Sequence, residues 1–145
     1  MKRSDRYPNT NWFMYYNHNP KSRITTDCVT RAISFVSGIP YDELLKKMCS
    51  FQIETGYDPT DGSVGMNKFF FSLGFRKNAQ PKTASNKKYT GKQFCNYLLE
   101  SGCTQNVVAN IGGHHVTTFI FSDGIYKCYD IWDPTDFCVG NFWIN

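Results

Sequence analysis

The fold of this chain is decided by the stretch from His114 to Asp133, which reads HHVTTFIFSDGIYKCYDIWD. Two runs rich in Val, Ile, Phe, Tyr and Thr flank Asp123-Gly124, and such runs are typical of β-strands. Asp and Gly both tolerate the positive φ of a two-residue type I′ turn, so the pair predicts a tight β-hairpin. With similar runs before and after it, the pattern predicts strands near 106–111, 114–121, 125–131 and 137–143.

The turn also fixes which side chains share a face of the hairpin. With a two-residue loop, Thr117 lies opposite Asp130, and His115 lies opposite Trp132. Paired side chains share a face, so His115 and Asp130 are predicted to be diagonal neighbours on one side of the sheet. His114 falls on the other side, because a shift of one residue changes the face. The register therefore selects His115 and Asp130 as candidate site residues.

Upstream of the strands, the sequence changes to a helical pattern. Asp27 or Thr26 can cap a helix, after which apolar residues recur at i, i+3, i+4 and i+7 until Gly38. Thr90-Gly91-Lys92-Gln93 is a capping box that begins a later helix, which Gly102 ends. Two further helices are predicted over 41–49 and 63–73, and the first covers 28–37. Helices followed by strands indicate an α+β fold, with N-terminal helices packed on a C-terminal antiparallel sheet.

Cys28 stands at the beginning of the first predicted helix. A thiol is mostly protonated at neutral pH, but a helix N-terminus and a neighbouring imidazolium both favour the nucleophilic thiolate. We therefore predict Cys28 as the nucleophile, His115 as the base and acid, and Asp130 as the group that orients the imidazole. The thiolate would attack a carbonyl to form a thioester, and the backbone N–H of Cys28 with one further donor would bind the oxyanion. Trp132 is a supporting residue, in the core or as a shield for the His–Asp hydrogen bond.

Several segments of the chain together resemble a known family. They are Asn17-His18-Asn19-Pro20, Asp27-Cys28-Val29-Thr30-Arg31-Ala32-Ile33, Gly38, Tyr41-Asp42-Glu43, His115-Val116-Thr117, Asp123-Gly124 and Tyr129-Asp130-Ile131-Trp132-Asp133. Over residues 17–48 and 90–143, the chain is similar to small papain-like cysteine peptidase-fold proteins of phage and prophage genomes. The resemblance implies a papain-like fold and a cysteine peptidase or related thiol hydrolase that acts on peptide or isopeptide bonds. Asp130-Ile131-Trp132 is similar to the family motif in which Asn or Asp precedes Trp by two residues.

One position departs from the family pattern. Papain-like enzymes usually carry a glutamine six residues before the nucleophile as an oxyanion donor, and this chain has Ser22 there. Asn17 and Asn19 are the side chains that could substitute for it. The departure favours an alternative, a catalytically weak or inactive papain-like fold that binds and inhibits a host protein. A cell-wall peptide amidase is a second alternative, although the sequence shows no wall-binding module or export signal.

At 145 residues the chain is expected to form one domain, residues 27–145, on which an N-terminal extension of residues 1–26 packs. No apolar run approaches the roughly 18–20 residues of a membrane helix, and the first residues do not form an apolar signal segment. A cytoplasmic protein is therefore predicted, located in the bacterial host if the gene is a phage gene. The cysteines are expected to be mostly free thiols without zinc-site spacing, and no metal or cofactor is expected.

The positive charge is unevenly distributed along the chain. The formal net charge is +4, and residues 62–99 contain seven basic side chains but no acidic one. This basic interval, Lys68–Lys92, is a candidate surface for a host protein partner, but a solvated surface is the preferred interpretation, because no nucleic-acid-binding motif accompanies it. For the protein as a whole, the expected partner is a protein or peptide substrate, with neither nucleic acid nor a membrane.

Overall fold

The hairpin forms with the register that the sequence predicts. In the computed structural model, which describes residues 1–145, β4 (His115–Ser122) and β5 (Ile125–Asp130) pair antiparallel, with Ser122 opposite Ile125. Asp123 and Gly124 adopt the positive φ values of 55° and 80° that the turn requires. The two-residue loop is therefore confirmed, and so is the prediction of which hairpin side chains share a face.

Six strands form one mixed sheet in the order β1-β5-β4-β3-β6-β2. Besides the hairpin, they are β1 (Phe13–Tyr15), β2 (Arg76–Asn78), β3 (Val107–Ile111) and β6 (Val139–Ile144). The prediction of a purely antiparallel, C-terminal sheet is wrong, since β1 runs parallel to β5 and β2 pairs with β6 at the other edge. Both added strands have three residues, too few for an alternating pattern to be visible in sequence. The segment 1–26 thus supplies an edge strand.

Five helices accompany the sheet in an α+β fold. They are α1 (Arg3–Arg6), α2 (Cys28–Ser37), α3 (Tyr41–Thr55), α4 (Gly65–Ser72) and α5 (Gly91–Glu100). The first predicted helix, 28–37, matches α2 and ends at Gly38 in the left-handed conformation, with φ of 77°. The second predicted helix corresponds to α3, which continues past the predicted end at Cys49. It ends at Gly56, which also has a left-handed conformation, with φ of 76°.

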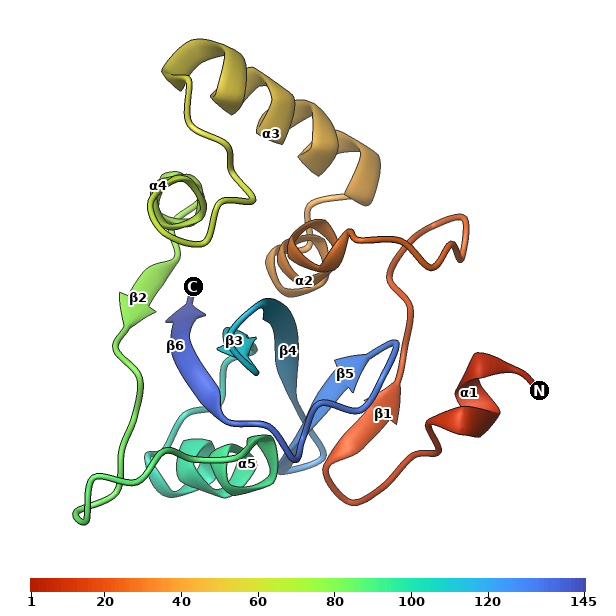
Figure 1. Cartoon of the computed structure of the whole chain (residues 1–145), viewed down its shortest axis with the longest axis vertical. Coiled ribbons are helices and arrows are strands. Elements are labelled where there is room, and N and C mark those ends of the chain that lie inside the picture. Colours follow the sequence, from red (N-terminus) through yellow and green to blue (C-terminus); the bar gives the residue numbers. More distant parts are fainter.

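Helices cover both faces of the sheet (Figure 1). On one face, Phe94 and Leu98 of α5 pack on strand residues such as Phe119 and Phe142. On the other face, α2, α3 and α4 enclose a second cluster: Val29, Ala32, Ile33, Leu44, Met48, Met66, Phe69, Phe70, Phe75, Val108, Val116 and Trp143. Because side chains alternate along a strand, neighbouring residues of β3 and β6 belong to different clusters. The second cluster seats the N-terminus of α2 against the beginning of β4, and this junction holds the candidate site.

Candidate active site

Asp130 lies at the end of β5 and accepts four hydrogen bonds. Its Oδ2 accepts from His115 Nε2 and from Thr117 Oγ1, each at 2.6 Å. Its Oδ1 accepts from Arg31 Nη1 at 3.2 Å and from the backbone N–H of Ile131 at 2.7 Å. The residue is only 2% exposed, so these donors take the place of water around its carboxylate. The His115–Asp130 pair that the register predicted is thus in direct contact.

The Cys28 thiol and the His115 imidazole shift each other's pKa. Burial raises the pKa of the thiol, but hydrogen bonds with His115 and the Val116 backbone, together with the positive charges of His115 and Arg31, lower it overall. Burial lowers the pKa of His115, whereas its hydrogen bonds with Asp130 and Cys28 and their negative charges raise it to about 9. Because Asp130 bonds Nε2, Nδ1 is the ring nitrogen that remains for another partner. Both pKa shifts act in the direction of a thiolate–imidazolium ion pair.

Arg31 belongs to the site, and the sequence reasoning did not identify it. Burial raises the pKa of Asp130, but the hydrogen bonds from His115 and Thr117 and the charges of His115 and Arg31 lower it overall. The guanidinium also pairs with Asp27, whose Oδ1 lies 2.8 Å from Arg31 Nε. The available signal was the i,i+4 spacing of Asp27 and Arg31, which marks an intrahelical ion pair but does not reveal its contact with β5.

Asp27 occupies the N-cap position of α2, but its side chain does not cap the helix. The prediction of a side-chain cap from Asp27 is therefore wrong. Its carboxylate accepts instead from Tyr41 Oη at 2.6 Å, from Asn19 Nδ2 at 3.0 Å and from Arg31. These donors draw the carboxylate away from the first turn of α2. The backbone N–H groups of Val29 and Thr30, which a cap from Asp27 would bond, are consequently left without that side-chain partner.

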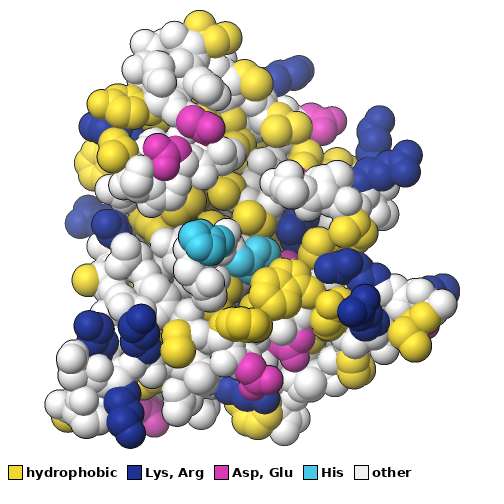
Figure 2. Space-filling model, viewed as in Figure 1, with side chains coloured by type: hydrophobic (Ala, Val, Ile, Leu, Met, Phe, Trp, Pro, Cys, Tyr) yellow, Lys and Arg dark blue, Asp and Glu magenta, His cyan; other side chains and the backbone are white.

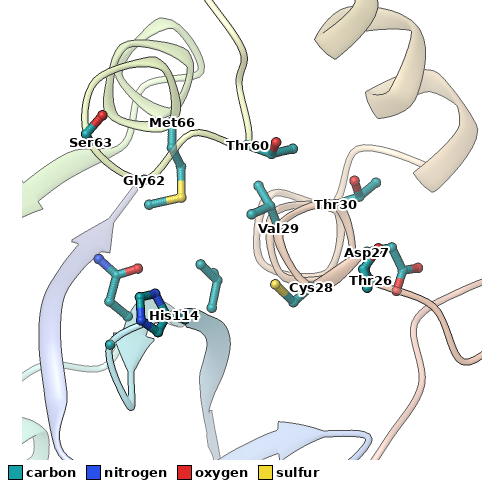
Figure 3. A pocket seen from close by; sticks show the side chains of 13 residues that line it. Thr26, Asp27, Cys28, Val29, Thr30, Thr60, Gly62, Ser63, Met66 and His114 are labelled. Carbon is teal, nitrogen blue, oxygen red and sulfur yellow. The ribbon is translucent and has the colours of Figure 1, made fainter.

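A cleft of about 690 Å³ opens beside Cys28. It is lined by the beginning of α2, by the loop that precedes α4, and by the turn between β3 and β4 (Figure 3). Val29, Met66 and Val116 supply its apolar surface, and the exposed His114 stands on its rim. Figure 2 shows histidine side chains at the centre of this face, with hydrophobic side chains beside them. The thiol therefore lies at the edge of an open cleft that an extended chain can enter.

Gly65, the first residue of α4, allows the loop that lines the cleft to pack closely. A Cβ atom at this position would lie 1.9 Å from the backbone oxygen of Asp58. Gly65→Ala should therefore displace this loop and lower the free energy of unfolding by about 1–3 kcal/mol, measured by urea denaturation. Gly62→Ala in the same loop is the matched control, because its added Cβ meets no atom within 4 Å. Equal losses in the two variants would contradict this account of the loop.

The predicted oxyanion side chains do not line the cleft. Asn17 Nδ2 donates to the backbone oxygen of Arg23 at 3.0 Å, and the Asn19 amide is bound to Asp27. Ser22 is exposed and has a left-handed backbone, with φ of 55°. None of Asn17, Asn19 and Ser22 is among the residues around the opening beside the thiol. An oxyanion donor at the site has to come from elsewhere in the chain.

Trp132 packs against the imidazole of His115. The two ring centroids are 5.0 Å apart at an interplanar angle of 53°, and Trp132 also contacts the exposed ring of Phe137, with centroids 5.8 Å apart. The indole thereby restricts the position of the His115 ring. His114, one residue earlier, is exposed and does not contact Asp130.

The basic interval Lys68–Lys92 extends from α4 through β2 to the first turn of α5. Lys92 is already engaged, since its Nζ lies 2.8 Å from Asp136 Oδ1 and 5.3 Å from the centroid of the Trp12 ring. Lys87 and Lys88 are exposed in the connection between β2 and α5. A role for this interval in binding a host protein stays a prediction.

Comparisons with protein-family models, curated proteins and solved structures found no match to this chain. The structure contains no group of three or more His, Cys, Asp or Glu side chains arranged to hold a metal ion. None of its helices combines the length and the apolar character needed to cross a membrane.

Proposed function

We propose that this protein is a papain-like cysteine hydrolase that cleaves peptide or isopeptide bonds. The observation that carries the proposal is the 2.6 Å hydrogen bond between His115 and Asp130, together with the lowering of the Cys28 pKa by the same imidazole. The placement of these residues supports it further. The cysteine begins a helix, the histidine begins a strand, and Asp130 ends the adjacent strand two residues before Trp132.

The reaction would proceed in two steps. The thiolate of Cys28 attacks the carbonyl carbon of the scissile bond, and His115 gives its proton to the departing amine, which leaves a thioester on the sulfur. His115 then accepts a proton from a water molecule, which attacks the thioester and releases the carboxylic acid. Asp130 keeps the imidazole in the orientation that both transfers require. The free thiolate–imidazolium pair is restored at the end.

The oxyanion donor in this proposal is the backbone at the beginning of α2. The N–H of Cys28 lies at a helix N-terminus that no side chain caps, and the partial positive charge there favours a developing oxyanion. Ser22, Asn17 and Asn19 do not line the cleft, so none of them takes the place of the usual glutamine donor. In this proposal the backbone N–H supplies part of the oxyanion stabilisation instead. The chain therefore requires no glutamine before the nucleophile to stabilise some negative charge.

Alkylation with iodoacetamide, followed residue by residue with mass spectrometry, tests this proposal. Because the thiolate is the reactive form, Cys28 should react at pH 6 at least about tenfold faster than an ordinary thiol. Cys49, which is exposed on α3, provides the comparison within the same molecule. The advantage of Cys28 should shrink as the pH rises above about 8.5, where ordinary thiols ionise as well.

The same measurement separates the proposal from its rivals. If Cys28 reacts no faster than Cys49 at pH 6, the thiol is not activated, and a non-catalytic protein that binds a host partner becomes the better reading. Cys28→Ala must remove the fast-reacting site while leaving the alkylation of Cys49 unchanged. Cleavage of cell-wall peptides and of protein substrates by the unmodified chain then distinguishes an amidase from a peptidase.

A further inference from the structure

The buried guanidinium of Arg31 joins two carboxylates on different elements. Its Nε lies 2.8 Å from Asp27 Oδ1, and its Nη1 lies 3.2 Å from Asp130 Oδ1. Arg31 is 6% exposed and Asp130 is 2% exposed, so water screens their contact little. With the proposed ion pair of His115 and Cys28, the site becomes a series of five groups whose charges alternate. In order they are Asp27, Arg31, Asp130, His115 and Cys28. A neutral residue at position 31 would leave Oδ1 of the buried Asp130 without its charged partner.

We propose that Arg31 is a positioning residue of the active site, which acts on Cys28 and His115 through the carboxylate of Asp130. The inference rests on the proposed function, because it concerns the same ion pair. Arg31 and the Ile131 backbone N–H occupy Oδ1, so Oδ2 is the oxygen that receives His115. Holding one oxygen in this way sets the direction of the other toward the imidazole.

Arg31 also aligns the nucleophile with the sheet. Cys28 and Arg31 lie three residues apart on α2, so both side chains project from neighbouring positions of one helix face. The contact of Arg31 with Asp130 on β5 therefore fixes the helix turn that carries the thiol relative to the hairpin that carries His115. A planar guanidinium can bond two carboxylates through different nitrogens, whereas a lysine ammonium acts as a single point charge.

The other titratable groups around this pair come from α3, from β5 and from the loop between β1 and α2. Tyr41 on α3 donates to Asp27, and burial followed by that hydrogen bond raises the pKa of Tyr41 to about 12. Cys128 on β5 lies near Asp130, and burial together with that charge raises the pKa of its thiol well above the ordinary value. His18 bonds Ser34 on α2, and burial lowers the pKa of its ring. These shifts keep all three groups neutral near pH 7.

The rate of Cys28 alkylation by iodoacetamide from pH 4 to 9 tests the role of Arg31. In Arg31→Met, the rate at pH 6 should fall by about tenfold or more, and the profile should move to higher pH, because a charge that favours the thiolate is gone. Arg31→Lys should give an intermediate profile.

Arg76→Met is the matched control, because Arg76 is exposed on β2 at the sheet edge away from β5. An unchanged profile in Arg31→Met would overturn the inference. A loss of rate that is the same at every pH would also overturn it, since packing alone then explains Arg31. If Arg31→Met does not fold, the profile of Arg31→Lys decides by the same criteria. Failure of the proposed function itself is distinct, since unmodified Cys28 would then react no faster than Cys49.

Discussion

Replacing His115 with glutamine should lower the rate of Cys28 alkylation at pH 6 by about 100-fold. The substitution removes the imidazolium whose hydrogen bond and charge favour the thiolate, while the glutamine amide can still reach toward Asp130. General acid–base groups commonly contribute about 10²–10⁴-fold to a reaction rate. Without His115 to accept a proton from water, turnover of an activated ester such as p-nitrophenyl acetate should also stop at the acylated cysteine. Site-resolved mass spectrometry measures both the alkylation rate and the trapped acyl group.

His114→Gln is the control for this experiment. It makes the same chemical change one residue earlier, at an exposed position that does not contact Asp130. Its alkylation profile should match that of the unmodified protein. Similar losses in the two variants would mean that His115 has no special relation to the thiol.

Replacing Asp130 with alanine should lower the free energy of unfolding by about 3–5 kcal/mol, because the change leaves Arg31 buried with one of its two carboxylate partners missing. His115 and Thr117 also lose their acceptor. The loss should be measurable as a fall of about 10 °C or more in Tm. Asp130→Asn should lose less, since an amide oxygen can still accept hydrogen bonds.

The difference in stability between the unmodified protein and Asp130→Ala should also depend on pH in a defined direction. The folded protein lowers the pKa of Asp130, so its contribution is fully present above the unfolded value of about 3.9 and is lost as the pH falls below it. The unmodified protein and Asp130→Ala should therefore converge in stability in acid. Asp136→Ala serves as control, because that carboxylate is 83% exposed beside Lys92 and exposed pairs contribute about 0–1 kcal/mol. A loss in this control as large as that of Asp130→Ala would refute the buried-pair explanation.

The sequence predicted the hairpin and its register because local chemistry determines both. The Asp123-Gly124 turn requires positive φ at two positions, and once the loop length is set, every cross-strand pair follows. The edge strands β1 and β2 could not be predicted in the same way. They are stabilised by pairing with β5 and β6, which lie far from them in the sequence, and three residues carry too little pattern of their own.

The residues of the candidate site also differ in whether local sequence or long-range packing places them. Cys28, His115 and Asp130 were accessible to sequence reasoning because a helix start and a hairpin register place them. Arg31 was not, because its bond to Asp130 spans 99 residues and depends on how α2 packs on the sheet. The i,i+4 spacing of Asp27 and Arg31 was the one local sign, and it indicates an ion pair at the start of α2 without indicating the contact with β5.

The uncapped start of α2 links stability and reactivity in this protein. Asp27 has the side chain of a good N-cap, and a cap typically contributes about 1 kcal/mol, yet its carboxylate is held by Arg31, Tyr41 and Asn19 instead. The stabilisation that a side-chain cap would give to α2 is thus absent beside Cys28. Selection for thermal stability alone would favour variants that restore the cap, and a capping carboxylate there would offset the partial positive charge of the helix N-terminus beside the thiol.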